Sequence, residues 1–294
     1  MVSIPSSPRP VGDPGVVQSF AQLCRPTLSV LAALVGCLTI YALNPVEPGL
    51  VYLLIAMVLA CMTAGAFAIN DYDDIEKDRI NHPERPLPSG TLLPQQAWWV
   101  AVILFCGSLL AAIPLGLLPL LLVSVSAFLL WNYSAILMVS GILGNGVVAI
   151  IVAAAIVLAS LVAGRPLAML YPSAFLFCYI LAKEIVWDIH DVVGDRNRSI
   201  TTLANRWGIQ PAFYTAWGLL TLLLISIPIA IAHLGMVHPL LFGICTAILL
   251  VSFALALLRY QRVQTASTYR SLIVWGRIGM ILGLIGLLGT APPL

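Results

Sequence analysis

The chain has 294 residues, of which 61% are hydrophobic and 9% are charged, and its formal net charge is +2. A soluble domain would carry about a quarter charged residues, so this composition excludes an ordinary soluble protein and predicts a polytopic membrane protein. The net charge indicates no particular partner, and we expect none that is a nucleic acid. Six scattered cysteines without a C-x-x-C pair argue against zinc and iron–sulfur sites.

Residues 1–20 are rich in Pro, Ser and Gly, and they predict a flexible cytoplasmic tail ahead of a single transmembrane domain over residues 21–294. A bilayer-spanning helix needs about 17–25 apolar residues. Nine stretches meet this requirement, near 27–43, 50–69, 95–113, 115–136, 143–163, 170–187, 211–232, 238–258 and 271–290. The third and fourth meet at Pro114 and Gly116, which predict a tight turn. The sequence therefore predicts an all-α protein with nine transmembrane helices.

Basic residues predict the orientation of these spans. Twelve of the fourteen fall on one side of the expected membrane or at its border, whereas Arg165 falls opposite and Arg277 lies inside the last span. Because cytoplasmic loops carry the excess of Lys and Arg, we expect the N-terminus inside and the C-terminus on the opposite side.

Acidic residues are concentrated in two places, after the second and sixth apolar stretches. Ten of the twelve lie there. Asp71, Asp74 and Asp78 recur as Asp188, Asp191 and Asp195, each moved by 117 positions. This spacing places three carboxylates on one helical face, so we expect each helix to extend beyond the bilayer with an acidic stripe. Both clusters fall on the predicted cytoplasmic side, where they can meet across one cavity mouth. Ionisable groups at a membrane are costly, which makes these clusters a functional hypothesis.

The chemistry of stacked carboxylates points to a divalent cation. Carboxylates repel one another unless a cation lies between them, and all-oxygen ligands favour Mg²⁺ or Ca²⁺ over Zn²⁺. Two facing stripes suit a diphosphate bridged by metal ions. Interleaved groups that fit the same ligand are Asn70, Arg79, Arg85, Lys183, Arg196 and Arg198. A phosphate-bearing head beside an apolar bundle implies a lipid diphosphate. The alternative is a pair of solvated acidic loops. We expect Asp73, Glu76 and Glu84, which lie off the repeated stripe, to be solvated or paired with Lys77 and Arg79.

Two long motifs carry a resemblance to a known family. Residues 70–78 read N-D-Y-D-D-I-E-K-D and are followed by R-P-L-P-S-G at residues 85–90. The second segment carries Tyr179, Lys183 and the carboxylates of residues 184–195 in a Y-x-x-x-K-E-x-x-x-D-x-x-D-x-x-x-D pattern. Both resemble the signatures of the UbiA-type intramembrane prenyltransferases. The second segment is most similar to the digeranylgeranylglyceryl phosphate synthase and chlorophyll-synthase-like branches.

The resemblance implies nine helices around a central cavity that opens sideways to lipid and is capped by two Asp-rich loops. It implies Mg²⁺-dependent ionisation of an allylic polyprenyl diphosphate, of about geranylgeranyl size, followed by attack of a small acceptor. By this resemblance Asp71, Asp74, Asp191 and Asp195 are the expected catalytic metal ligands, and Asp78 and Asp188 support them or add metal contacts. Asn70, Arg79, Arg85, Lys183 and Arg196 are expected to hold the diphosphate.

Several points stay open at this stage. Family members often carry a base soon after a Tyr-Ser pair, but Tyr133 and Ser134 precede an uncharged segment, which puts a phosphorylated or carboxylated acceptor in doubt. An intramembrane terpene cyclase without an acceptor is therefore the second hypothesis, and a cation-coupled transporter the third. Aromatic faces can stabilise an allylic cation or serve as an interfacial belt. The candidates are Trp131, Tyr133, Tyr179 and Trp187. Arg277 is expected to face either the cavity or a backbone carbonyl.

Overall fold

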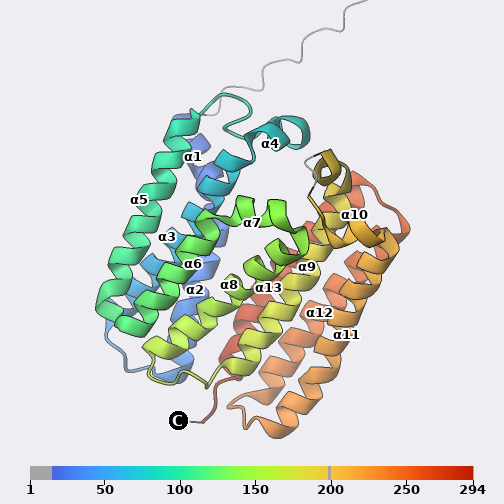
Figure 1. The fold of residues 1–294 in the computed structure, drawn as a ribbon. Coiled ribbons are helices and arrows are strands. Elements are labelled where there is room, and N and C mark those ends of the chain that lie inside the picture. Colours follow the sequence, from blue (N-terminus) through green and yellow to red (C-terminus); the bar gives the residue numbers. More distant parts are fainter. Residues whose placement is uncertain (1–14, 198–199, 294) are drawn as a thin grey trace, which may run out of the picture.

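The computed structural model describes residues 15–197 and 200–293, without the side chains of residues 80–81, 137–139 and 193–197. All regular structure in these ranges is helical (Figure 1). In chain order the elements are α1 Val16–Cys24, α2 Pro26–Leu43, α3 Gly49–Asp73, α4 Ile75–Asn81, α5 Pro94–Ala112, the 3₁₀ turn η1 Ile113–Leu115, α6 Leu117–Trp131, α7 Tyr133–Val139, α8 Gly141–Val162, α9 Leu170–Asn197, α10 Leu203–Trp207, α11 Ile209–His233, α12 Pro239–Arg262 and α13 Ala266–Gly289.

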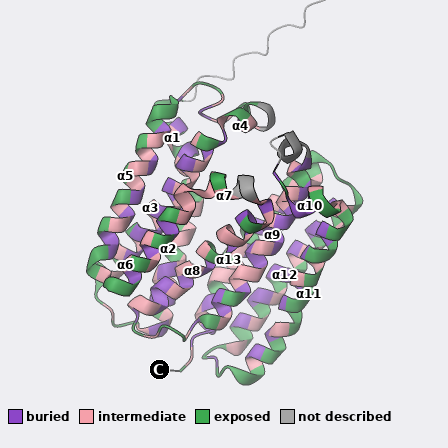
Figure 2. Ribbon diagram, viewed as in Figure 1, coloured by how far each residue is buried: buried purple, intermediate pink, exposed green. Residues whose placement is uncertain are grey.

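The long helices are membrane-spanning in length and composition. Eight in the described ranges qualify: α2, α3, α5, α8, α9, α11, α12 and α13. Exposed residues lie along the outer faces of these helices (Figure 2). They include large apolar side chains such as Trp99, Tyr214 and Leu240. In a soluble protein so much exposed apolar surface would cause aggregation, but it suits contact with lipid. The protein is a multi-pass integral membrane protein.

The expected helix over residues 115–136 is divided in the structure. Its main part, α6, has 15 residues, which is shorter than the other spans, and α7 follows after Asn132. The Asn132 side chain donates a hydrogen bond to the Phe128 carbonyl at 2.8 Å, and the Asn132 backbone amide donates to the same carbonyl at 3.1 Å, so this residue caps the end of α6. The expected turn at Pro114 is confirmed, since η1 ends at Gly116 with a φ of 108°.

The helices form a bundle with two different ends. One end carries α1, α4, α10 and the last turns of α9, and we call it the acidic end because both carboxylate motifs lie there (Figure 1). The C-terminal residues lie at the opposite end (Figure 1). The start of α1 at Val16 falls inside the segment for which the sequence predicts a flexible tail, because Leu23 and Ser19 are fully buried and hold the helix against the bundle.

Tight packing of α12 against α13 fixes one wall of the bundle. Gly286 lies against Cys245 and Gly289 lies against Phe242. A Cβ atom at position 289 would come within 2.6 Å of the His238 carbonyl oxygen, so only glycine allows the two backbones to approach this closely. The side of α13 that contains Met280 is thereby held toward the interior.

Candidate active site

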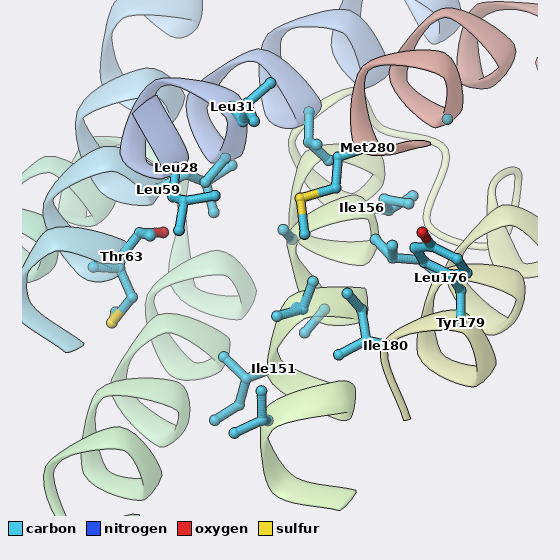
Figure 3. Close-up of a pocket in the computed structure, with 18 of the residues that line it drawn as sticks. Leu28, Leu31, Leu59, Thr63, Ile151, Ile156, Leu176, Tyr179, Ile180 and Met280 are labelled. Carbon is cyan, nitrogen blue, oxygen red and sulfur yellow. The ribbon is translucent and has the colours of Figure 1, made fainter. Parts of the chain in front are cut away.

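A cavity of about 560 Å³ lies between α2, α3, α6, α8, α9, α12 and α13. Its lining is largely apolar, and Figure 3 shows Leu28, Leu59, Ile151 and Met280 among the side chains around it. Helix α9 contributes a stripe with helical spacing: Pro172, Phe175, Leu176, Tyr179, Ile180, Lys183, Glu184 and Trp187. The stripe changes from apolar to charged along the helix, so the cavity has an apolar body and a polar mouth.

The polar mouth lies at the acidic end. Arg25 and Asn70 line it from one side, and Lys183 and Glu184 line it from the other. Asp74 follows Asn70 by about one helical turn, and Asp188 follows Glu184 by the same interval. Helix α4 also contacts α9. The structure therefore brings the two acidic motifs together at one end of one cavity.

The first motif keeps its three repeated carboxylates on the inside. Asp71, Asp74 and Asp78 are 3%, 6% and 2% exposed, whereas the intervening Asp73 and Glu76 are exposed. The expected single straight helix is wrong, because α3 ends at Asp73 and α4 begins at Ile75. The amide groups of Asp74 and Asp78 still donate to carbonyls four residues earlier, at 2.9 and 2.8 Å. The helical spacing thus survives the break, and the carboxylates keep a common face.

Two arginines compensate these buried charges. Arg25 Nη2 donates to Asp71 Oδ1 at 2.7 Å, and Arg85 Nη1 donates to Asp78 Oδ2 at 2.7 Å. Arg85 also lies 3.5 Å from Asp71. Burial lowers the pKa of the Arg25 guanidinium, and the adjacent Asp71 carboxylate acts in the opposite direction. The charge-assisted pairs explain how the carboxylates remain buried near the membrane.

Arg25 is a site residue that the sequence analysis did not identify. It joins α1 to α2 with a φ of 46°, a left-handed conformation that costs a non-glycine residue about 1–3 kcal/mol. Its guanidinium also lies 4.2 Å from the centre of the Phe67 ring. The available signal was a cation directly before Pro26 at the start of the first span. What it contacts depends on a residue 46 positions away, which spacing does not reveal.

The second motif lies on α9 and is held by other partners. Asp188 accepts a hydrogen bond from Asn145 Nδ2 of α8 at 2.7 Å, and Asn145 is 3% exposed. Lys183 is 3% exposed, and its Nζ lies 4.4 Å from the centre of the Trp187 ring. Asp191 is half-buried. The side chains of Asp195 and Arg196, and residue Arg198, lie outside the described part of the structure.

Two predicted diphosphate contacts in the first motif differ in position. Asn70 lines the cavity, and its amide donates to Asp74 Oδ2 at 3.4 Å. Arg79 is 60% exposed on the outer side of α4, where its guanidinium pairs with Glu76 at 2.7 Å. The structure therefore does not bring Arg79 to the inward carboxylates, because it lies one residue off their face.

Three of the four aromatic candidates line the cavity wall. Tyr133, Tyr179 and Trp187 line it, whereas Trp131 packs against Trp98 and Phe105 with ring centres 6.1 and 5.8 Å apart. Tyr179, labelled in Figure 3, is 2% exposed. Its ring contacts that of Phe253, with ring centres 5.5 Å apart. Its hydroxyl has no hydrogen-bond partner among the described residues. The inner wall of the cavity thus presents an aromatic ring close to the polar mouth.

The donor set fits a hard divalent cation. Every candidate ligand at the acidic end is a carboxylate oxygen, and Mg²⁺ prefers oxygen. No three carboxylate, imidazole or thiol side chains in the described ranges converge closely enough to hold an ion by themselves. That arrangement suits a cation which binds one or two carboxylates and takes its other ligands from phosphate and water.

Comparison with known proteins supports the same family. A family model described as the UbiA prenyltransferase family matches residues 29–281. The digeranylgeranylglyceryl phosphate synthase of Sulfolobus acidocaldarius is 33% identical over 227 residues, which cover 77% of this chain and 82% of that protein. A solved structure described as a study of digeranylgeranylglyceryl phosphate synthase in membranes has a TM-score of 0.69 and 24% identity, and the match covers 94% of this chain and 98% of that chain.

A UbiA homologue from Archaeoglobus fulgidus, bound to GPP and Mg²⁺, has a TM-score of 0.68 at 14% identity, over 92% of this chain and 99% of that chain. At this identity the match concerns the fold alone. The family model spans most of the membrane domain, including both acidic motifs. This chain belongs to the UbiA prenyltransferase family.

Proposed function

We propose that this prenyltransferase moves a polyprenyl group of about geranylgeranyl size from an allylic diphosphate to a small acceptor, with Mg²⁺ as the cofactor. The observation that carries the proposal is the single cavity with an apolar body and a mouth between two acidic motifs. An apolar chain fits the body of such a cavity, and its diphosphate belongs at the charged mouth. The relative from Sulfolobus acidocaldarius is a digeranylgeranylglyceryl phosphate synthase, which favours transfer to an acceptor over cyclisation.

The length of the cavity supports a donor of this size. Pro172 lies eleven residues before Lys183 on α9, or roughly 16 Å along the helix axis. Each isoprene unit adds four carbon–carbon bonds of about 1.5 Å, which extend roughly 5 Å. Three to four units therefore span the apolar body, and a lateral opening to lipid would admit a longer tail. This length is that of a farnesyl to geranylgeranyl chain.

We assign the acidic residues to the metal–diphosphate head. Asp71, Asp74, Asp191 and Asp195 are the proposed catalytic ligands, and Asp78 and Asp188 support them. A bound Mg²⁺ would neutralise phosphate charge and make the diphosphate a better leaving group. Asn70, Arg85, Lys183 and Arg196 would hold the phosphate oxygens. Arg25 joins this set because it lines the mouth, and Arg79 leaves it because it points outward.

The reaction requires a dry and electron-rich pocket. The C1–O bond of the donor breaks with its electron pair leaving on the diphosphate, and an acceptor hydroxyl forms the new bond to C1 while its proton passes to the released diphosphate. Water would compete for the allylic cation, so the apolar lining protects it. Tyr133, Tyr179 and Trp187 line the cavity and are the proposed stabilising faces.

We also propose that the acidic end faces the cytoplasm, because the basic residues gather there. The described chain begins near that end and its last residues lie at the other, which supports a C-terminus on the opposite side (Figure 1). Labelling of cysteines placed singly at exposed positions near each end, in intact membranes, would test this orientation.

The test of the function uses the purified full chain in lipid nanodiscs with geranylgeranyl diphosphate and Mg²⁺, with and without a glyceryl phosphate ether lipid. We expect diphosphate release that needs both Mg²⁺ and the acceptor, stops with EDTA and returns when Mg²⁺ is restored. A cyclic hydrocarbon or alcohol formed without an acceptor would contradict transfer and point to the cyclase. Full turnover in EDTA would contradict the metal–diphosphate head.

A further inference from the structure

Arg277 occupies an unusual position for a charged residue. It lies eleven residues after Ala266 and twelve before Gly289, in the middle of the membrane-spanning α13. Its side chain is exposed, and no hydrogen bond or ion pair joins it to another described residue. A cation at this depth is costly, and such residues usually mark a substrate or ion path. The position therefore calls for an anionic partner.

Arg277 lies on α13 beside the face that borders the cavity, and it is not itself a lining residue. Met280, Leu284 and Leu287 line the cavity, and Arg277 continues their spacing by one turn toward the acidic end. Figure 3 shows Met280 pointing into the cavity, with Leu31 of α2 nearby. A separate stripe of exposed residues faces outward: Val274, Ile278, Ile281 and Ile285. Arg277 thus lies between the cavity face and the lipid face, at the side edge of the cavity.

The positive charge of Arg277 repels that of the Lys183 ammonium, which lines the cavity mouth from α9. Two arginines near the mouth already form ion pairs with the first acidic motif: Arg25 pairs with Asp71, and Arg85 pairs with Asp78. Arg277 therefore adds positive charge on the lipid side of the mouth, away from the paired arginines.

We propose that Arg277 binds the phosphomonoester head group of the acceptor lipid and so selects an anionic acceptor. This inference rests on the proposed prenyl transfer and names the class of acceptor. A lipid that enters from the side would place its phosphate at Arg277 and its hydroxyl toward the donor at the mouth. Arginine suits this ligand, because its planar fork binds phosphate through two hydrogen bonds.

The inference also accounts for the uncharged segment after Tyr133. The sequence lacks a base there, which put a phosphorylated acceptor in doubt. Tyr133 lines the cavity from α7, whereas Arg277 reaches the cavity edge from α13. A cation supplied from α13 makes the base after Tyr133 unnecessary.

The test compares two acceptors in nanodiscs of neutral phosphatidylcholine. One is a glyceryl phosphate ether lipid, and the other is the same lipid without its phosphate. The proteins are the wild type, Arg277→Gln, Arg277→Lys and the control Arg262→Gln, whose arginine is exposed at the end of α12. Initial rates give KM and kcat for each acceptor and for geranylgeranyl diphosphate.

We expect Arg277→Gln to raise KM for the phosphorylated acceptor at least tenfold. The KM for geranylgeranyl diphosphate and the rate with the dephosphorylated acceptor should stay unchanged, which also shows that the variant is folded. Arg277→Lys should give an intermediate KM for the phosphorylated acceptor, because lysine keeps the charge and cannot form the two parallel hydrogen bonds of a guanidinium. Arg262→Gln should match the wild type.

Three results would overturn the inference. A rise in the KM of the diphosphate donor alone would place Arg277 in the donor site. Equal losses with both acceptors would make its role structural. An effect of Arg277→Gln that appears only when anionic lipid is added to the nanodiscs would make the bilayer head group, rather than the acceptor, its partner. A wild type that prenylates neither acceptor would contradict the proposed function itself. Failure of the proposed function is thus distinguishable from failure of the Arg277 inference, which requires an active wild type.

Discussion

Arg25 donates a hydrogen bond to Asp71 at 2.7 Å and thereby ties the start of the first long helix to the last turn of the second. Asp71 is 3% exposed, and the Arg25 side chain is 29% exposed at the cavity mouth. The pair therefore contributes both to stability and to the site, because the same guanidinium neutralises a buried carboxylate and is accessible to a ligand.

Replacing Arg25 should damage both stability and turnover. Arg25→Ala leaves Asp71 with the longer contact to Arg85, so we expect a loss of about 1–3 kcal/mol in stability and at least a tenfold fall in kcat/KM. Arg79→Ala is the matched control, because its arginine is 60% exposed and pairs with Glu76. Thermal unfolding in detergent and diphosphate release measure the two effects. Similar losses in both variants would show that net charge at this end matters more than the Arg25 contact.

The carboxylates of the repeated stripes should be far more sensitive than their neighbours. Asp74→Asn and Asp191→Asn are expected to lower kcat by at least a hundredfold, because each removes a proposed cation ligand while keeping the side-chain volume. Glu76→Gln, at a side chain that is 81% exposed, should retain wild-type rates. The measurement is steady-state diphosphate release. Full activity in both aspartate variants would rule out the proposed metal–diphosphate head.

Asn145 offers a way to weaken cation binding without touching a proposed ligand. Its amide holds Asp188 at 2.7 Å. Loss of a hydrogen bond that orients a metal ligand typically costs 10–100-fold in metal affinity or activity. We expect Asn145→Ala to raise the Mg²⁺ concentration for half-maximal rate by at least tenfold, with partial recovery of rate at high Mg²⁺. Asn44→Ala, which removes an amide paired with Glu47 elsewhere in the chain, serves as the control. An unchanged Mg²⁺ titration would argue against a role for Asp188 near the cation.

Tyr179 separates the effect of an aromatic ring from that of a hydroxyl. Its hydroxyl lacks a hydrogen-bond partner among the described residues, so Tyr179→Phe should leave stability unchanged or slightly higher. If the ring face stabilises the allylic cation, Tyr179→Phe should keep most of the rate and Tyr179→Leu should lose about tenfold, since a cation–π contact contributes about 0.5–2 kcal/mol. A large loss already in Tyr179→Phe would assign the role to the hydroxyl instead.

Local spacing predicted much of the candidate site. The i, i+3, i+7 pattern of Asp71, Asp74 and Asp78 indicated one common face, and all three are buried while Asp73 and Glu76 are exposed. In a helix, residues three and four positions apart lie on the same face, so the sequence shows which side chains share a face. The helix break at Asp74 and the division at Asn132 were not predicted, because hydropathy averages over a window and is insensitive to a single capping residue.

The sequence by itself determined that this is a helical membrane protein, that its acidic charge lies in two copies of one motif, and to which family it belongs. The first two follow from composition and from local helical periodicity, and the family follows from the resemblance of the two long motifs. Only the tertiary structure decided that Arg25 pairs with Asp71, that Asn145 holds Asp188, that Arg79 points outward, and that Arg277 is exposed beside the cavity-lining face of α13. The first two are contacts between residues 46 and 43 positions apart, and the others depend on which helix face is covered, so each is set by how the helices pack against one another.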